Sequence, residues 1–128
     1  MNLEWLYMKY KTFEELPIFQ DSLNLVQEVY GLTAINYKLK KDYSLIDQMR
    51  RAAVSVSANI AEGFERGSNN DFVKFLFYSK GSIGEVRALL LVAEKLDYVS
   101  LKISKEHREK CISISKQISK FINYLKKS

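Results

Sequence analysis

The sequence predicts an all-α protein whose single domain is an antiparallel, up-and-down, left-handed four-helix bundle. Proline occurs once and glycine five times in 128 residues, too few for the many turns of a sheet protein. Short alternating runs such as residues 54–57 lie inside helical patterns, and no separate strand pattern is visible. Four segments instead place apolar residues at steps of three and four. Short connections between long helices make neighbours antiparallel, which completes the predicted bundle.

The length of 128 residues suits one domain with one core. We expect the four-helix bundle domain to span residues 13–128. Residues 1–12 are rich in aromatic side chains and have no clear helical period, so we treat them as an N-terminal leader. Their sequence leaves open a short extra turn, a disordered leader or part of an interface.

The first predicted helix runs from Pro17 to Asn36. Proline suits the first turn of a helix because its missing N–H would have no partner there. Residues 38–43 then form a polar connection. The inward face of this helix is predicted to hold Phe19, Leu23, Val26 and Tyr30.

The second predicted helix follows Ser44, which we expect to cap it together with Asp47. It ends near Arg66, and Gly67 stops it because glycine readily takes the left-handed conformation that follows a helix. Its apolar seam is Leu45, Met49, Ala52, Val56, Ile60 and Gly63.

The third and fourth predicted helices span Asn70–Leu96 and the segment after Ser104, with residues 68–71 and Ser104 as caps. The inward set of the third is Phe72, Phe75 or Leu76, Ser79, Ile83, Val86, Leu90 and Ala93. The seam of the fourth is His107, Cys111, Ile114, Ile118, Phe121 and Leu125. Further apolar residues lie off these seams: Phe77, Leu89, Leu91, Val92, Ile112 and Ile122. We interpret this second face as burial against another copy of the chain.

A polar stripe lies beside the apolar seam of the second predicted helix. It consists of five residues at helical spacing: Arg51, Ser55, Asn59, Glu62 and Arg66. The third predicted helix offers Ser82 and Glu85 at matching spacing. Because buried charges must be paired, we hypothesise a hydrogen-bonded network among these residues, within the bundle or between subunits.

Catalysis has little support in the sequence. Glu62 and Glu85 could share a pocket as an acid–base pair, but no Gly-x-Ser-x-Gly elbow and no phosphate-binding glycine loop is present. His107 and Cys111 share a helical face, whereas a structural zinc site needs four ligands. Both lie on the apolar seam, where a cysteine acts as a small hydrophobic residue. We therefore expect no enzyme activity, no metal and no cofactor.

Cysteine usage and apolar runs bear on the compartment. One cysteine excludes an intramolecular disulfide and fits a reducing compartment. The longest apolar run, Ala88–Ala93, is far too short to span a bilayer, and no signal peptide is visible. We expect a cytoplasmic protein without a membrane partner.

The positive charge of the chain is unevenly distributed. The net charge is +5, and residues 102–128 hold eight Lys or Arg against Glu106 and Glu109. This asymmetry suits a polyanionic partner, although a solvated lysine-rich helix explains it equally well. No base-reading motif is visible, so we expect RNA or DNA binding with little sequence selectivity. The candidate contacts are Lys38, Lys40, Lys41, Arg50, Lys105, Arg108, Lys116 and Lys120.

Two segments, QMRRAAVSVSANIAEGFER and FVKFLFYSKGSIGEVRALLLVAEKLDYV, closely resemble a known four-helix-bundle family. The family is named for proteins encoded in intervening sequences of 23S rRNA genes, and the accessory protein of diversity-generating retroelements is a related group. The similarity covers about residues 13–126. In the loop before the second helix, Tyr37-Lys38 stands where the family usually has Phe-Pro, and Lys41 stands where it has an acid. This end of the molecule is therefore more basic than the family pattern implies.

The resemblance implies a homopentamer with a central channel, and nucleic-acid binding in the retroelement relatives, which partner a reverse transcriptase. We therefore expect a non-enzymatic, homo-oligomeric bundle, pentameric by the resemblance, whose basic surface binds RNA or DNA. The alternative is a protein–protein adaptor that recruits a partner such as a reverse transcriptase and has no direct nucleic-acid role. Binding that weakens steeply with salt favours the first function, and a salt-insensitive protein partner favours the second.

Overall fold

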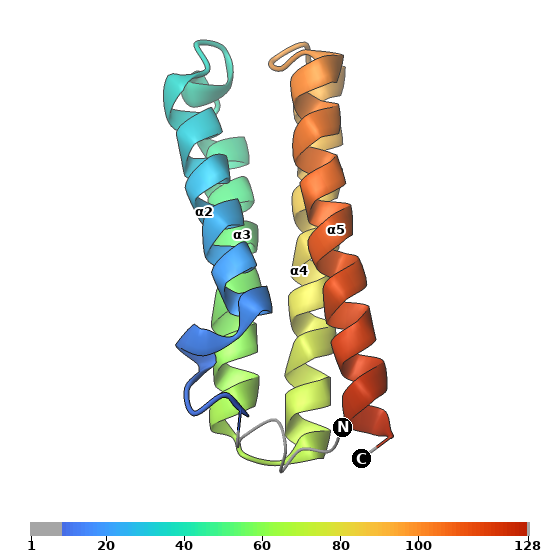
Figure 1. Ribbon diagram of the computed structural model, residues 1–128. Helices are drawn as coiled ribbons and strands as arrows, with labels where there is room; N and C mark the ends of the chain where they lie inside the picture. Colours follow the sequence, from blue (N-terminus) through green and yellow to red (C-terminus); the bar gives the residue numbers. More distant parts are fainter. Residues whose placement is uncertain (1–8, 128) are drawn as a thin grey trace.

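The computed structural model describes residues 9–127, which form four long helices and two short 3₁₀ helices (Figure 1). The elements are η1 (Phe13–Glu15), α2 (Pro17–Ile35), η2 (Leu39–Lys41), α3 (Tyr43–Glu65), α4 (Asn69–Lys95) and α5 (Leu101–Lys126). None of the described residues lies in a strand. The predicted all-α fold with four long helices is confirmed.

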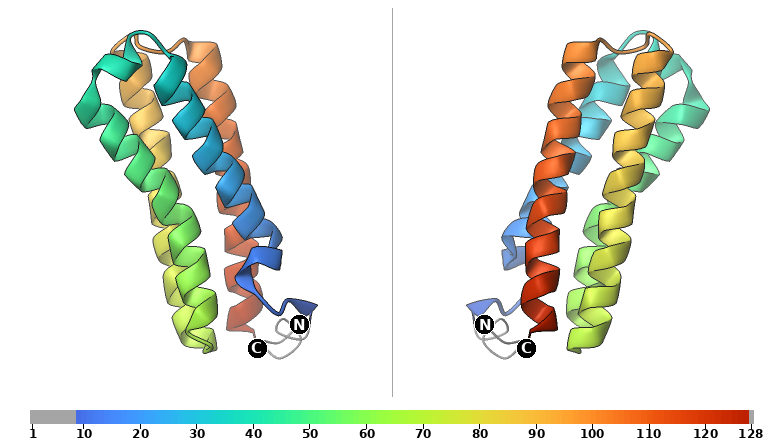
Figure 2. Two further views of the ribbon diagram at one scale, coloured as in Figure 1. Left: turned by 90° about the vertical axis from the view of Figure 1, so that its left-hand side faces the viewer. Right: turned by 90° about the vertical axis from the view of Figure 1, so that its right-hand side faces the viewer.

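Successive helices run in opposite directions and pack in chain order, α2 on α3, α3 on α4 and α4 on α5 (Figure 1). The α2–α3 and α4–α5 connections lie together at one end of the bundle, and the α3–α4 connection lies at the other (Figure 2). The left-handed arrangement stays a prediction. Of the predicted leader, residues 1–8 lie outside the described residues, whereas Tyr10 packs against the core.

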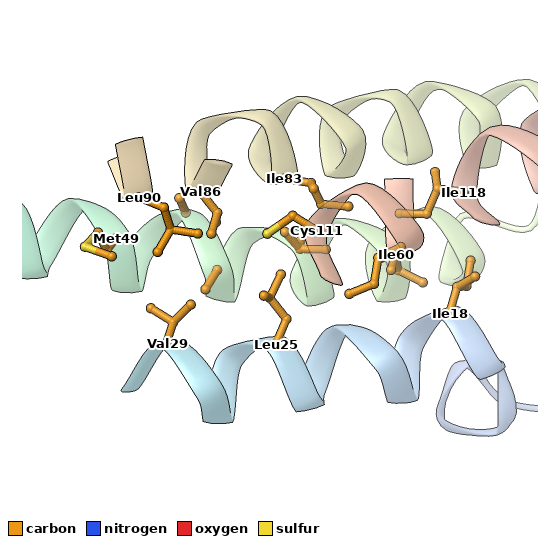
Figure 3. Close-up of a cluster of buried hydrophobic side chains, with 14 of the residues drawn as sticks. Ile18, Leu25, Val29, Met49, Ile60, Ile83, Val86, Leu90, Cys111 and Ile118 are labelled. Carbon is orange, nitrogen blue, oxygen red and sulfur yellow. The ribbon is translucent and has the colours of Figure 1, made fainter. Parts of the chain in front are cut away.

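The core runs along the axis of the bundle, and every long helix contributes to it (Figure 3). Leu25 of α2, Met49 of α3, Leu90 of α4 and Ile118 of α5 are all 0–1% exposed. Each fully buried side chain of this size contributes roughly 1.5–3 kcal/mol of hydrophobic stabilisation. The fold therefore depends on a continuous apolar interior to which all four amphipathic helices turn one face.

The inward faces of α3 and α4 are confirmed residue by residue, because every member of the two predicted sets is buried. Helix α5 differs slightly from its prediction. His107 and Phe121 are half-buried, whereas Ile122, which we assigned to the outer face, is 2% exposed. The seam therefore passes through Ile122 in the last turns of α5.

The inward face of α2 was predicted wrongly. Leu23 and Tyr30 are each 41% exposed and Val26 is half-buried, so only Phe19 of the predicted set is buried. The buried residues are Ile18, Phe19, Ser22, Leu25, Val29, Leu32 and Thr33.

Two buried hydroxyl residues account for this error. Ser22 donates a hydrogen bond to the Phe19 carbonyl oxygen at 2.6 Å, and Thr33 donates to the Val29 carbonyl oxygen at 2.8 Å. Local bonds to the helix backbone satisfy these hydroxyl groups, so they enter the core at little cost. The apolar period of α2 is therefore interrupted at two of its inward positions.

The predicted N-caps of α3 and α5 were also wrong. Asp42, rather than Ser44, accepts the Leu45 N–H at 3.1 Å, and α3 begins at the next residue, Tyr43. Ser100 accepts the Ile103 N–H at 3.1 Å and caps α5. At the α3–α4 connection the prediction is confirmed, since residue 67 is a glycine with a φ of 77° and the Ser68 hydroxyl accepts the N–H of Asp71.

Candidate functional site

The polar stripe forms a link between α3 and α4 at its centre. The Asn59 side-chain amide donates to the Ser55 carbonyl oxygen at 2.8 Å and to its hydroxyl oxygen at 3.0 Å. Across the helix pair, the hydroxyl oxygens of Ser82 and Ser55 lie 3.0 Å apart. These three side chains are half-buried, and they are the part of the hypothesised network that the structure brings together.

The charged members of the stripe form their ion pairs along α3, and Arg66 also lies 5.0 Å from the ring centroid of Phe75 on α4. Arg51 pairs with Asp47 at 2.9 Å and Arg66 pairs with Glu62 at 3.1 Å, each four residues apart. Exposed pairs of this kind contribute roughly 0.3–0.5 kcal/mol each. Glu85 is exposed and joins no hydrogen bond or ion pair among residues 9–127. Within one protomer, the charged residues therefore lie outside the Ser55–Asn59–Ser82 link.

The two arginines among the candidate nucleic-acid contacts bind side chains of neighbouring helices in the protomer. Arg50 donates to the Thr33 hydroxyl oxygen at 2.8 Å, and its guanidinium carbon lies 4.5 Å from the centroid of the Tyr30 ring. Arg108 donates to the Ser104 hydroxyl oxygen at 3.0 Å and pairs with Glu94 of α4 at 3.3 Å. Both arginines join neighbouring helices, so we leave them out of the candidate interface.

Four exposed lysines form a line along α5, which we call the lysine ridge: Lys102, Lys105, Lys116 and Lys120. At 3.6 residues per turn they fall within about 60° of arc, on the side of the helix opposite the buried residues. The ridge is roughly 27 Å long. Glu109 shares this face, but none of the four lysines forms an ion pair with any residue between 9 and 127. Lys102 was not among the predicted contacts, although helical spacing alone places it on this face.

The remaining candidates, Lys38, Lys40 and Lys41, lie in the α2–α3 connection. The Lys38 ammonium group lies 3.4 Å from the Asp97 carbonyl oxygen, and that of Lys41 lies 4.0 Å from the centroid of the Tyr37 ring. Two exposed tyrosines, Tyr37 in this connection and Tyr43 at the start of α3, were not among the predicted contacts. Their position beside three lysines was the available signal.

An apolar strip covers the outer side of α4. Phe77, Leu91 and Val92 are 42–47% exposed, and Gly81 and Gly84 have open space beside them. Among residues 9–127, no helix packs against these two glycines, so this face leaves room for a close helix contact. Runs of exposed apolar residues on one face are typical of interaction surfaces.

The two residues weighed as metal ligands, His107 and Cys111, do not form a metal or nucleophilic centre with other residues of the described range 9–127. Burial in the core raises the pKa of the Cys111 thiol to about 11, so the thiol is protonated at neutral pH and is a poor metal ligand. The His107 ring nitrogen Nδ1 lies 2.9 Å from the Ile103 carbonyl oxygen. Within residues 9–127, no three His, Cys, Asp or Glu side chains gather as metal ligands would. In the same range, no helix has the length and apolar character that crossing a bilayer demands.

Comparison with curated proteins finds no match. Among solved structures, the fold is similar to that of a protein with unknown function from the S23 ribosomal protein family of Bacteroides thetaiotaomicron. The two chains are 20% identical and superpose with a TM-score of 0.76, over 82% of this chain and 97% of the other. At this identity the likeness supports the fold alone.

The sequence also matches a family model over most of its length. The match, to the 23S rRNA-intervening sequence proteins, covers residues 14–120 and so extends from before α2 into the last turns of α5. It confirms the resemblance that the segments around Asn59 and Glu85 carry. The chain belongs to the family of 23S rRNA-intervening sequence proteins.

Proposed function

We propose that this protein is a non-enzymatic, homo-oligomeric bundle of the cytoplasm that binds RNA or DNA through the lysine ridge of α5. One observation carries the proposal: four exposed lysines line the outer face of a single helix without ion-pair partners among the described residues. Lysine ammonium groups neutralise phosphates and release condensed counterions, which favours binding at low salt. The ridge has no partly buried polar groups for reading base edges, so little sequence selectivity follows.

Self-association strengthens this mechanism. The apolar strip on α4 supports a contact between copies of the chain, because such a contact would bury the exposed side chains of Phe77, Leu91 and Val92 away from water. The family resemblance supports a pentamer. Five copies would bring five ridges together and raise the net charge from +5 to about +25. The buried, single cysteine supports a reducing, cytoplasmic setting.

The test is a titration of labelled single-stranded and duplex RNA and DNA at rising KCl concentrations. The wild-type affinity should fall steeply with salt. Lys116→Glu should weaken binding about tenfold at low salt. The slope of log affinity against log salt concentration should fall in magnitude by about 1 for each ridge in contact with the nucleic acid. Lys74→Glu is the matched control, since Lys74 is an exposed lysine of α4 and the change in charge is the same.

Light scattering must first show that both variants keep the wild-type mass. Equal losses in the two variants would mean that net charge, rather than the ridge, drives binding. Absence of binding at low ionic strength would remove the nucleic-acid function. It would leave the adaptor alternative, for which the apolar strip on α4 is the available docking surface.

A further inference from the structure

The α2–α3 connection and the first residue of α3 present aromatic and basic side chains together at one end of the bundle. We call residues 37–43 the tyrosine–lysine loop. Tyr37 is 68% exposed and Tyr43 is 81% exposed. Between them, Lys38, Lys40 and Lys41 are exposed as well. Two aromatic rings and three ammonium groups therefore face solvent within seven residues.

The backbone of this loop is held in place. Leu39, near its centre, is 0% exposed, and its N–H donates to the Asn36 side-chain oxygen at 2.8 Å. The Asp42 N–H donates to the Leu39 carbonyl oxygen at 3.0 Å. The Asp42 carboxylate in turn accepts the Tyr98 hydroxyl at 3.1 Å, which joins the loop to the α4–α5 connection. The backbone that carries the exposed rings is thus already ordered, so ligand binding would cost little free energy for ordering the loop.

The charge at this end favours an anionic partner. The carboxylate of Asp42 already accepts two hydrogen bonds, from the Leu45 N–H and the Tyr98 hydroxyl. The Lys40 and Lys41 ammonium groups lie 5.8 and 4.0 Å from the centroid of the Tyr37 ring, so positive charge and an aromatic face coincide. Asp97 is an exposed acid at the same end, but three lysines outnumber it.

Each tyrosine can also meet a flat ligand. The ring of Tyr43 has no aromatic or cationic neighbour among residues 9–127, and both of its faces are open to solvent at 81% exposure. An open hollow beside Tyr37 is lined by Lys38, Asp97, Tyr98 and Ser100 among others. Ser100 caps α5 two residues before Lys102, where the lysine ridge begins. The hollow therefore lies within two residues, along the chain, of the first lysine of the ridge.

From this arrangement we infer that the tyrosine–lysine loop binds unpaired bases of single-stranded RNA or DNA, an inference that rests on the proposed function. A base stacks on Tyr43, a neighbouring base occupies the hollow beside Tyr37, and the lysines hold the phosphates between them. Sequence-tolerant binding of single strands combines stacking on aromatic rings with a basic path for the backbone in the same way. Bases inside a duplex are stacked on each other and cannot reach the rings, so the loop discriminates against duplexes.

The experiment compares a 12-nucleotide single strand carrying 2-aminopurine with a hairpin duplex of the same sequence. Stacking on a tyrosine should quench the 2-aminopurine fluorescence on binding of the wild type. Tyr43→Ala and Tyr43→Leu should each lower the affinity for the single strand by about tenfold, the range measured for loss of one stacked base. Affinity for the duplex should stay unchanged, and Tyr43→Phe, which keeps the ring, should behave as wild type.

The outcomes separate this inference from the proposed function. If the wild type bound neither the single strand nor the duplex, the proposed function would be overturned and the inference with it. Binding to both probes with no effect of Tyr43→Ala, or with equal losses on both, would overturn the inference alone. Vesicles containing phosphatidylserine form a further arm. If Tyr43→Ala weakened binding to vesicles and not to the single strand, the loop would be assigned to a membrane surface instead.

Discussion

Gly63 of α3 lies so close to Phe75 of α4 that a methyl group on the glycine would stand 2.8 Å from the Cβ atom of Phe75. It would also lie 3.0 Å from the ring of Phe72. A ring can rotate away, but the Phe75 Cβ atom is fixed to its backbone, so α3 and α4 would have to separate. The absence of a side chain at Gly63 sets how closely these two helices pack.

Gly63→Ala should therefore destabilise the protein by about 1–3 kcal/mol through overpacking, although alanine is the better helix former by about 1 kcal/mol. Gly31→Ala is the matched control, because Gly31 is an exposed glycine within α2 with open space beside it. That variant should be more stable by roughly 0.5–1 kcal/mol. Urea unfolding of the two variants measures both values, and a stabilised Gly63→Ala protein would contradict the close approach.

Sequence periodicity was sufficient to predict the inward faces of α3 and α4, because nearly all the inward residues of these helices are apolar. It failed for α2, where Ser22 and Thr33 occupy inward positions and bond to their own backbone. A buried hydroxyl and an exposed one look alike in a sequence. The inward face of α2 could therefore be established only from its packing against α3 and α5.

The candidate site shows the same limit for charged residues. Lys105 and Arg108 are both basic residues of α5, but only Arg108 has an acidic partner, Glu94 on the neighbouring helix. That pairing is a tertiary contact between residues 14 positions apart, and no local pattern predicts it. The lysine ridge, in contrast, follows from helical spacing along one element and could be predicted from the sequence.

Asn59→Leu tests whether the Ser55–Asn59–Ser82 link has a structural role. Loss of the two hydrogen bonds that Asn59 donates to Ser55 should destabilise the protomer by about 1 kcal/mol. If the polar stripe also fixes the contact between subunits, the variant should change its mass in light scattering. Gln48→Leu is a suitable control, because Gln48 makes a similar bond to the Ser44 carbonyl oxygen four residues back but none to α4.

Two outcomes are informative for this pair. A change in mass confined to Asn59→Leu would support the polar stripe as part of the subunit contact. Native mass in Asn59→Leu, and likewise in Glu62→Leu, would exclude the stripe from that contact and leave Asn59 with a role inside the protomer.

Leu91→Glu should dissociate the proposed oligomer. Leu91 is 47% exposed on the apolar strip of α4, and a carboxylate placed there would have to be buried without a partner in any contact between strips. Leu23→Glu makes the same change at a 41% exposed position of α2 and should leave the oligomer intact. Analytical ultracentrifugation of both proteins gives the answer. If both variant oligomers dissociated equally, or if neither dissociated, the apolar strip would be excluded as the subunit interface.

Cys111 should make the stability of the protein fall at high pH. Burial raises the pKa of its thiol from 9.0 to about 11, so the unfolded chain releases this proton more readily than the folded one. The stabilisation is fully present below pH 9 and is lost as the pH rises through about 11, with a total effect on the order of 3 kcal/mol. Lysines and tyrosines titrate in the same range, so the measured quantity is the difference between wild type and Cys111→Ala. Urea unfolding at pH 8 and at pH 10.5 should show the wild type losing more stability than the variant, and parallel losses would mean that the thiol is open to water.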